Sequence, residues 1–118
     1  MLKKGFRLKR NEDFSKVFRF GKPFFVDSIG CKAMRNGSET TLVGISVAKK
    51  LFPKASERNR VKRVFSHVLE EAYIHLPSGI SMIFFYRKKP TEFLFDVVKT
   101  QVSAIIADIN KYSGNKRV

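Results

Sequence analysis

An almost unbroken apolar run at residues 80–86 restricts the fold of this chain more than any other segment. The run reads Ile-Ser-Met-Ile-Phe-Phe-Tyr and lies between two stretches of turn residues, Pro77-Ser78-Gly79 and Lys89-Pro90-Thr91. A run of this length and composition is typical of a strand in the centre of a sheet. We therefore expect a small sheet with helices packed against it.

Local signals before this run predict a helix and a pair of strands. Asn11 resembles a helix N-cap because two acidic residues follow it, and Gly21 is suited to the other end. A helix is therefore expected at about residues 12–20. The turn dipeptide Asn36-Gly37 then separates two β-rich segments, residues 24–34 and residues 41–47. This pattern predicts antiparallel pairing of the two segments.

Two longer helices are predicted in the second half of the chain. Ser56 is a candidate N-cap for residues 57–75, where apolar side chains recur at helical spacing. Thr91 is a candidate cap for a last helix with the same spacing as far as Ser113-Gly114. The prediction is an α+β fold, with residues 114–118 as a frayed tail.

The chain carries a large excess of positive charge. Its 118 residues include 24 Lys and Arg but only 10 Asp and Glu, so the formal net charge is +14. The basic residues gather in three segments, at residues 1–22, 48–63 and 87–89, instead of alternating with acidic residues. Such a surface attracts polyanions, and we expect a single RNA-binding domain over residues 1–118.

Other classes of protein are disfavoured. The longest apolar run covers only a few residues, and the first residues lack the apolar segment of a secretory signal, so we expect a cytoplasmic protein without a membrane partner. Cys31 is the only cysteine and there are only two histidines. An internal disulfide is therefore impossible, and no metal site built from the protein is expected.

The helix predicted at residues 57–75 has an apolar side and an unusual order of charges. On a helical wheel the apolar side consists of Val61, Phe65, Val68 and Ala72, and the opposite side of Asn59, Arg63, Ser66 and Glu70. Basic residues crowd the first turns, although the helix dipole favours acidic residues there: Arg58, Arg60, Lys62 and Arg63. Phosphate groups docked at this end would remove the conflict, so we interpret it as a phosphate-binding surface.

Three separated motifs resemble the bacterial ribonuclease P protein family. The opening stretch at residues 7–18 is similar to the start of that family. The most specific motif is Val-Gly-Ile-Ser-Val-Ala-Lys-Lys at residues 43–50, followed by Arg-Asn-Arg-Val-Lys-Arg at residues 58–63. Phe-Tyr-Arg-Lys-Lys at residues 85–89 falls where the family has a strand ending in Arg. The resemblance covers about residues 4–110.

The resemblance implies both a fold and a function. The fold would have the order αβββαβα and a small mixed sheet of about four strands, ribosomal-S5-domain-2-like, with a left-handed βαβ crossover against the usual rule. Residues 24–34 would then be two strands, split around Asp27-Ser28. The function would be to assist removal of the 5′ leader of precursor tRNA. One protein would bind one catalytic RNA, which carries the reaction and, with the substrate, most of the Mg²⁺.

The same resemblance assigns residues to two RNA sites. Contacts to the catalytic RNA would come from Lys49, Lys50, Arg58, Asn59, Arg60, Lys62, Arg63, Arg87 and Lys88. The family often has another Arg near the position of Ser66. The leader would lie between the first helix and the sheet, on Phe14, Phe18, Arg7 and Arg10. The residues alone leave open whether Phe14 and Phe18 instead anchor the first helix, and they place Phe84 and Phe85 in the core.

The sequence offers no set of groups for unaided RNA cleavage. His67 and His75 would be about 12 Å apart on one helix, too far to act together on one phosphate. The acidic residues are scattered, whereas a two-metal nuclease needs several carboxylates that converge. A ribosomal or other structural RNA-binding protein remains the alternative, because it would need the same charge and helix without a part in leader removal. A self-sufficient nuclease is disfavoured.

Overall fold

The computed structural model describes residues 6–8, 10–91 and 93–117 of the chain. Over these residues the elements follow the order αβββαβα, with one 3₁₀ turn after the second helix. Their bounds are α1 (Asn11–Phe20), β1 (Lys22–Val26), β2 (Ile29–Arg35), β3 (Leu42–Ser46), α2 (Ala55–Ala72), η2 (Tyr73–His75), β4 (Ile80–Tyr86) and α3 (Phe95–Arg117).

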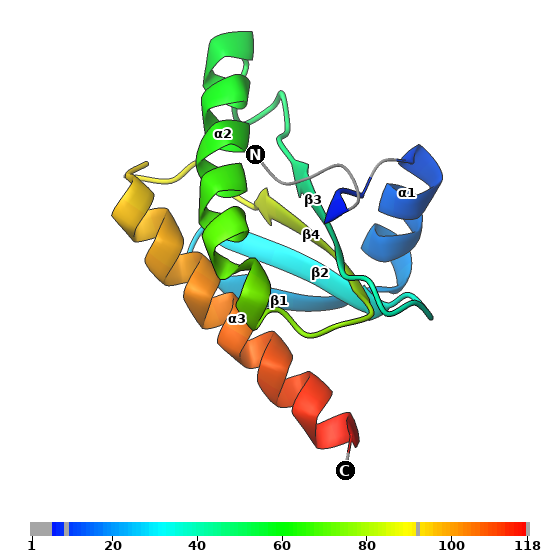
Figure 1. The fold of residues 1–118 in the computed structure, drawn as a ribbon. Coiled ribbons are helices and arrows are strands. Elements are labelled where there is room, and N and C mark those ends of the chain that lie inside the picture. The colour runs from blue at the N-terminus through cyan, green and yellow to red at the C-terminus, as the bar shows by residue number, and fades with distance from the viewer. Residues whose placement is uncertain (1–5, 9, 92, 118) are drawn as a thin grey trace.

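The four strands form one mixed sheet in the order β1-β2-β4-β3 (Figure 1). β2 pairs antiparallel with β1 and with β4, whereas β3 runs parallel to β4. β4 has a partner on each side, and every residue in it except Phe85 is buried. The central strand predicted at residues 80–86 is therefore confirmed. β3, α2 and β4 form the parallel βαβ unit, and the left-handed crossover expected for it stays a prediction.

The antiparallel pairing predicted between residues 24–34 and 41–47 is wrong, because β4 lies between β2 and β3. The tight turn is at Asp27-Ser28 instead, where Asp27 has a φ of 51°. Asp is one of the few residues that adopt this left-handed conformation readily. The split of residues 24–34 into two strands, which the resemblance implies, is confirmed.

The Asn36-Gly37 turn belongs to a longer loop that carries the chain past β4. The Asn36 side chain accepts a hydrogen bond from the Ser38 backbone N–H (2.8 Å) and donates to the Thr40 carbonyl oxygen (3.0 Å) and to Ser81 Oγ (3.2 Å). The last bond fastens the loop to the start of β4. An Asn whose side chain stabilises its own loop produces the same sequence pattern as a hairpin turn.

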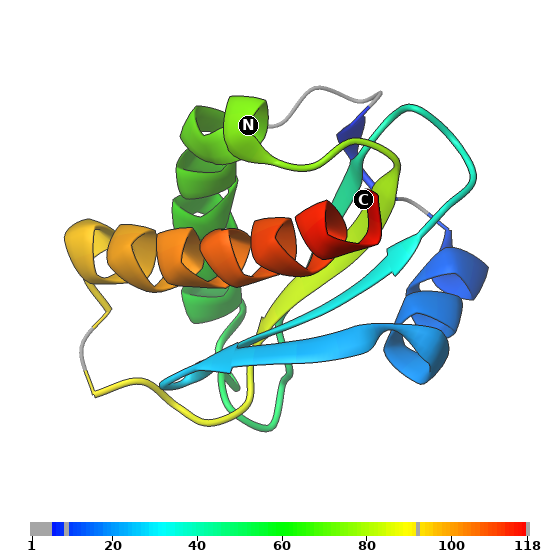
Figure 2. The same ribbon diagram turned by 90° about the horizontal axis from the view of Figure 1, so that it is seen from below.

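Helices cover the two faces of the sheet unequally (Figure 2). α2 and α3 lie on one face, and the large core beneath them includes the fully buried Phe65, Phe84 and Ile29. α1 lies on the other face, where a smaller core consists of Leu8, Val17 and Ile83. Because α1 is a single short helix, it leaves part of this second face uncovered.

The first two helices begin differently from the prediction. The N-cap residue of α1 is Arg10, and Asn11 is already helical. The N-cap residue of α2 is Lys54, so Ser56 lies inside the helix and caps nothing. Neither cap residue makes a side-chain capping bond. The Arg58 side chain instead donates to the carbonyl oxygens that precede α2, so it holds the loop before the helix without capping the free N–H groups of the first turn.

The last helix is displaced toward the C-terminus. It begins at Phe95 and not at the cap predicted at Thr91, because Phe93 packs edge-on against Tyr86 at 6.1 Å and holds this stretch on the core as a linker. It also continues through Gly114 to Arg117, where a frayed tail was predicted. One Gly costs a helix only about 1 kcal/mol and, without a Pro, does not end it. Val118 lies outside the described residues.

We expect the Tyr86→Phe variant to be more stable than the natural protein by about 1 kcal/mol. The Tyr86 hydroxyl is buried and has no hydrogen-bond partner among the described residues, and burial raises its pKa to about 12. Removing an unpaired buried hydroxyl removes its desolvation cost. Urea unfolding measures the difference. Tyr73→Phe is the matched control, because the Tyr73 hydroxyl donates to the Thr41 carbonyl oxygen at 2.8 Å, and this variant should lose about 1 kcal/mol. Equal changes in both variants would contradict the assignment.

Candidate nucleic-acid interface

The sheet face that carries α1 divides into three rows of residues that run across the strands. The strand register places Phe25, Gly30, Phe85 and Ser46 in the first row, which we call the aromatic row. The middle row contains Lys32, Ile83 and Gly44, and the third contains Met34, Ser81 and Leu42. α1 crosses the middle row: its Phe14 ring lies so close above Gly44 that a Cβ there would be 2.7 Å from the ring. Two surfaces therefore remain, one on each side of α1.

The first of these surfaces is a cluster of aromatic rings. The Phe85 ring lies 5.5 Å from that of Phe18 on α1 and 6.3 Å from that of Phe25 on β1, measured between ring centroids. Phe18 is 36% exposed and Phe25 is 47% exposed. Gly30 between them is needed, because a Cβ there would lie within 2.8 Å of both the Phe25 and the Phe85 ring. The cluster is therefore a preformed apolar platform that is open to solvent.

The prediction for Phe84 is confirmed, and that for Phe85 is confirmed only in part, because Phe85 packs against the smaller core but stays partly exposed. Phe84 is fully buried beneath α2, whereas Phe85 points to the opposite face and is half-buried. Neighbouring residues of a strand point to opposite faces, but the sequence did not show that the second face lacks a complete cover. Phe25, which the sequence analysis missed, joins the platform only through the β1–β2 register.

The four residues predicted for the leader site differ in their surroundings. Phe18 is exposed beside the platform, while Phe14 is half-buried and packs with the small core that anchors α1. Arg10 is exposed at the start of α1. Arg7 is half-buried beside β3, where it forms a single bridge with Val43, and its Nε has no hydrogen-bond partner among the described residues. The structure thus brings Phe18 to an open surface and gives Phe14 an anchoring position.

The apolar side of α2 is confirmed, with one exception. Val61, Phe65 and Val68 are buried and Ala72 is half-buried. Ser66, predicted on the exposed side, is only 5% exposed. Tyr73, which follows Ser66 by seven residues on the same side, stacks on Phe6 at 4.4 Å, so Phe6 lies on this side of the helix. His67, beside Ser66, is exposed.

The basic residues at the start of α2 are available in different degrees. Arg58 Nη1 donates to the carbonyl oxygens of Phe52 (3.0 Å) and Pro53 (2.8 Å), so this side chain holds the loop before the helix. The Arg60 guanidinium lies 5.4 Å above the Phe93 ring, and Arg60 is exposed. Three more residues predicted here are exposed: Asn59, Lys62 and Arg63. Within the described part of the chain, none of the four basic residues pairs with a carboxylate.

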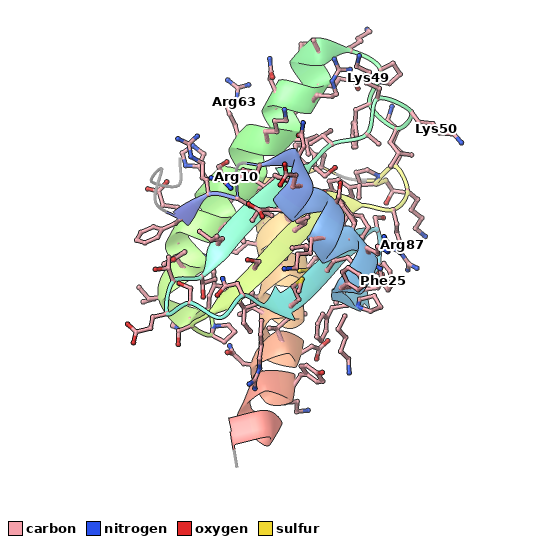
Figure 3. All side chains as sticks on the ribbon, turned by 90° about the vertical axis from the view of Figure 1, so that its right-hand side faces the viewer. Arg10, Phe25, Lys49, Lys50, Arg63 and Arg87 are labelled. Carbon is pink, nitrogen blue, oxygen red and sulfur yellow. The ribbon has the colours of Figure 1, made fainter. Side chains whose placement is uncertain are left out.

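The remaining predicted contacts lie in loops at the same edge of the molecule. Lys49 and Lys50 are exposed in the turn after β3, and Lys88 is exposed after β4. The Arg87 Nε donates to the Asp27 carbonyl oxygen at 2.8 Å, and its guanidinium lies 5.0 Å above the Phe25 ring. Figure 3 looks at the side that carries α1 and shows Arg63, Lys49, Lys50, Arg10, Arg87 and Phe25 together in that view. Basic and aromatic groups thus share one side of the protein.

The groups that hydrolysis would need are dispersed. Burial raises the pKa of the Cys31 thiol well above its ordinary value, so Cys31 remains a protonated core residue. In the part of the chain that the structure describes, no three His, Cys, Asp or Glu side chains are placed to share a metal ion. None of the described helices is both long and apolar enough to cross a membrane.

A small α+β fold with a net charge of +14, and with exposed rings and unpaired basic side chains on one side, is typical of RNA-binding proteins. A family model described as Ribonuclease P matches residues 2–110. The Ribonuclease P protein component of Thermoanaerobacter sp. is 30% identical over 117 residues, which are 99% of this chain and 100% of that protein. The component from Streptococcus pneumoniae is 33% identical over 87 residues, 74% of this chain and 70% of that protein. The chain therefore belongs to the bacterial ribonuclease P protein family.

Solved structures agree with this assignment. The ribonuclease P protein from Thermotoga maritima superposes with a TM-score of 0.77 and 26% identity, covering 85% of this chain and 94% of that one. The Staphylococcus aureus protein has a TM-score of 0.78 at 21% identity, covering 88% of this chain and 94% of that one, and supports the fold alone. Family membership makes the chain a subunit of a ribonucleoprotein endoribonuclease that acts with ribonuclease P RNA on precursor tRNA.

Proposed function

We propose that this chain binds ribonuclease P RNA through the start of α2 and the neighbouring loops, and the 5′ leader of precursor tRNA through the aromatic row and Phe18. The observation that carries the proposal is the open platform formed by Phe18, Phe25 and Phe85 beside basic side chains that no carboxylate neutralises within the described residues. We further propose that one protein binds one RNA and that the complex is cytoplasmic.

The start of α2 is suited to a folded RNA. Arg60, Lys62 and Arg63 are exposed within about one turn of α2, so the exposed part of the helix presents several cations to a phosphate backbone. The free backbone N–H groups of the first turn add donors at the same end. Arg58 contributes by holding the loop that carries Lys49 and Lys50 toward the helix, and Arg87 by holding the β1–β2 turn.

The platform is suited to a single-stranded leader of variable sequence. Every base has a π-face, so stacking on exposed rings binds unpaired bases without selecting among them. Arg87 lies above the Phe25 ring and places a positive charge at the edge of the platform, where the leader backbone would pass. Phe14 serves this site indirectly, by seating α1 over Gly44 and thereby positioning Phe18.

The chemistry is assigned to the RNA partner. Mg²⁺ bound mainly by that RNA and the substrate would supply the activated water and the charge neutralisation for hydrolysis. The described residues of this chain include no cluster of ligands that would hold such an ion. The chain's own contribution is to reduce the repulsion between two polyanions and to hold the leader in place.

Phe18→Ala is expected to weaken binding of leader-bearing tRNA to the protein–RNA complex by about 1–3 kcal/mol and to leave mature tRNA unaffected. The reason is the loss of one stacking ring from the open platform. Phe20→Ala is the matched control, since Phe20 lies on the same helix, is 65% exposed and is not among the rings that contact Phe85. Equilibrium binding of the two tRNAs measures both effects. If the variant bound both tRNAs more weakly by the same factor, the role of Phe18 would be purely structural.

A further inference from the structure

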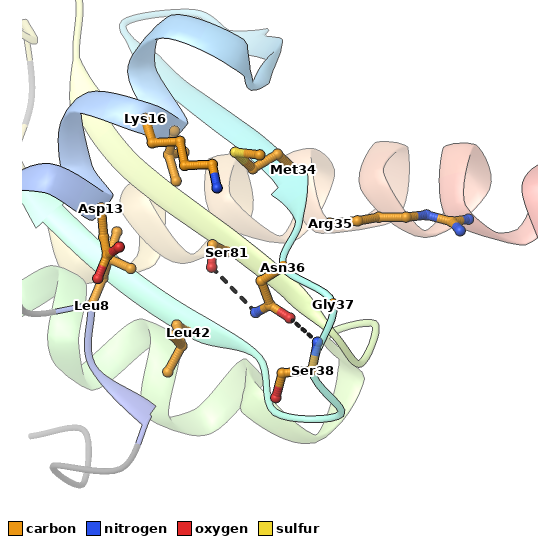
Figure 4. A pocket seen from close by; sticks show the side chains of 11 residues that line it. Leu8, Asp13, Lys16, Met34, Arg35, Asn36, Gly37, Ser38, Leu42 and Ser81 are labelled. Carbon is orange, nitrogen blue, oxygen red and sulfur yellow. Dashed lines mark hydrogen bonds between the residues drawn. The ribbon is translucent and has the colours of Figure 1, made fainter.

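A second recess lies on the other side of α1, away from the aromatic row. It is a cavity of about 440 Å³ between α1 and the third row of the sheet face, which we call the α1 pocket (Figure 4). Its walls are apolar side chains from the N-terminal segment, α1 and two strands: Leu8, Val17, Met34 and Leu42. Its rim is polar. A cavity of this size accommodates one small flat molecule.

Most polar groups at the rim are already engaged or point elsewhere. The Asn36 amide is engaged by its three bonds to Ser38, Thr40 and Ser81. Arg35 extends away from the pocket (Figure 4). Two groups remain, the Asp13 carboxylate and the Lys16 ammonium, and Figure 4 shows both descending from α1 toward the sheet.

The Asp13 and Lys16 side chains do not pair with each other and are available to a ligand. They are three residues apart on α1, which places their Cβ atoms about 5–6 Å apart on one side of the helix. No ion pair joins them, and neither side chain makes a hydrogen bond to the residues that the structure describes. Asp13 is half-buried and lines the same pocket as the apolar walls. A carboxylate at this position repels phosphate and accepts hydrogen bonds from a neutral donor.

Among the neutral flat groups that a strongly basic, RNA-binding chain meets, guanine fits this arrangement best. Its Watson–Crick edge presents two adjacent N–H donors, which a carboxylate accepts together, and beside them the O6 acceptor, which suits an ammonium. Adenine, cytosine and uracil each lack two adjacent donors on that edge. The apolar walls formed by Met34 and Leu42 would contact the faces of the ring.

We propose that the α1 pocket binds one unstacked guanine of a single-stranded RNA segment, with Asp13 on its N1 and N2 donors and Lys16 on O6. The proposal rests on the RNA-binding function proposed above but concerns a separate site. Ser81 in the pocket and Phe85 in the aromatic row are four residues apart along β4, about 13 Å, and α1 lies between them. The platform tolerates any base, whereas this pocket would select one.

The test compares RNA pentamers that differ at one base. Oligo-uridine with a central guanine, inosine or adenine is titrated with the full-length protein, and binding is followed by fluorescence anisotropy at fixed salt. Inosine lacks only the N2 amine, so its stacking matches that of guanine. We expect the guanine pentamer to bind at least about fivefold more tightly than the inosine pentamer, the lower end of what a bidentate base contact provides.

Two variants of equal charge separate the pocket from general electrostatics. Asp13→Asn should abolish the preference for guanine over inosine. Overall binding should not weaken, because the substitution also removes a negative charge that repels RNA. Glu12→Gln makes the same charge change at the exposed neighbouring position and should keep the preference. The NMR signal of the Met34 methyl group should shift with the guanine pentamer in the natural protein and in Glu12→Gln, but not in Asp13→Asn.

The outcomes distinguish this inference from the proposed function. The proposal that the α1 pocket binds guanine would be overturned if the natural protein showed no preference for guanine, or if the preference survived in Asp13→Asn. If Phe18→Ala still weakened all pentamers in that case, leader binding at the platform would stand. If no pentamer bound at all, both the pocket and the platform would be refuted. Loss of the preference in Asp13→Asn alone supports the assignment.

Discussion

Replacing both Arg60 and Arg63 with alanine is expected to lower the affinity of the protein for ribonuclease P RNA by about 3 kcal/mol, roughly a hundredfold. Both side chains are exposed on α2, and the structure gives neither a carboxylate partner within the described residues. Each phosphate contact that is lost also reduces the release of counterions. The slope of log affinity against log salt should therefore fall by about two.

The matched control removes two positive charges from a different helix. Lys99 and Lys111 are exposed on α3, and the Lys99→Ala/Lys111→Ala variant has the same net charge as the Arg60→Ala/Arg63→Ala variant. Filter binding over a series of KCl concentrations gives affinity and slope for both. The control should retain nearly the natural slope. If the slope of log affinity against log salt fell equally in both variants, total charge and not the position on α2 would determine binding. The start of α2 would then not be the docking surface.

Phe65→Ala should have the largest effect on stability, a loss of about 3–5 kcal/mol from the free energy of unfolding. The Phe65 ring is fully buried on the apolar side of α2 and contacts the rings of Phe84 at 6.3 Å and Tyr86 at 5.4 Å. Truncation removes apolar contact and leaves a cavity between α2 and the sheet. Because the free energy of unfolding of natural domains is about 5–15 kcal/mol, this loss would be a large part of the total.

Urea unfolding monitored by circular dichroism measures this loss. Leu94→Ala is the control, since Leu94 is 57% exposed and its truncation should cost within about 0.5 kcal/mol. A Phe65→Ala variant as stable as the control would show that α2 is not held by this ring. RNA that binds only the folded state should raise the apparent stability of the variant again.

The parts of the fold that follow from periodicity were predictable. The apolar run of β4 and the spacing of Val61, Phe65 and Val68 predicted a central strand and the buried side of α2, and both are confirmed. Strand pairing was not predictable from the residues, because Asn36-Gly37 signals a turn but not which strand is its neighbour. The helix starts were missed because packing contacts, such as that of Phe93 on Tyr86, outweighed the local capping signals.

The basic part of the site could be predicted from the sequence. The aromatic part could not, because it depends on the register of the strands. The clusters at residues 48–63 and 87–89 could be recognised from composition alone. The platform could not, because Phe25 and Phe85 meet only through the pairing of β1, β2 and β4 across Gly30. The hydrogen bonds of Arg58 to carbonyl oxygens likewise depend on the path of a loop.

Cleavage of precursor tRNA at low Mg²⁺ separates binding from chemistry, because we expect this chain to supply binding and its RNA partner to supply the chemistry. The reaction is followed with protein alone, with ribonuclease P RNA alone and with both. We expect no cleavage by the protein alone, slow cleavage by the RNA, and strong stimulation when the two are combined. Leader removal by the protein alone, or an RNA reaction that the protein leaves unchanged, would contradict this expectation.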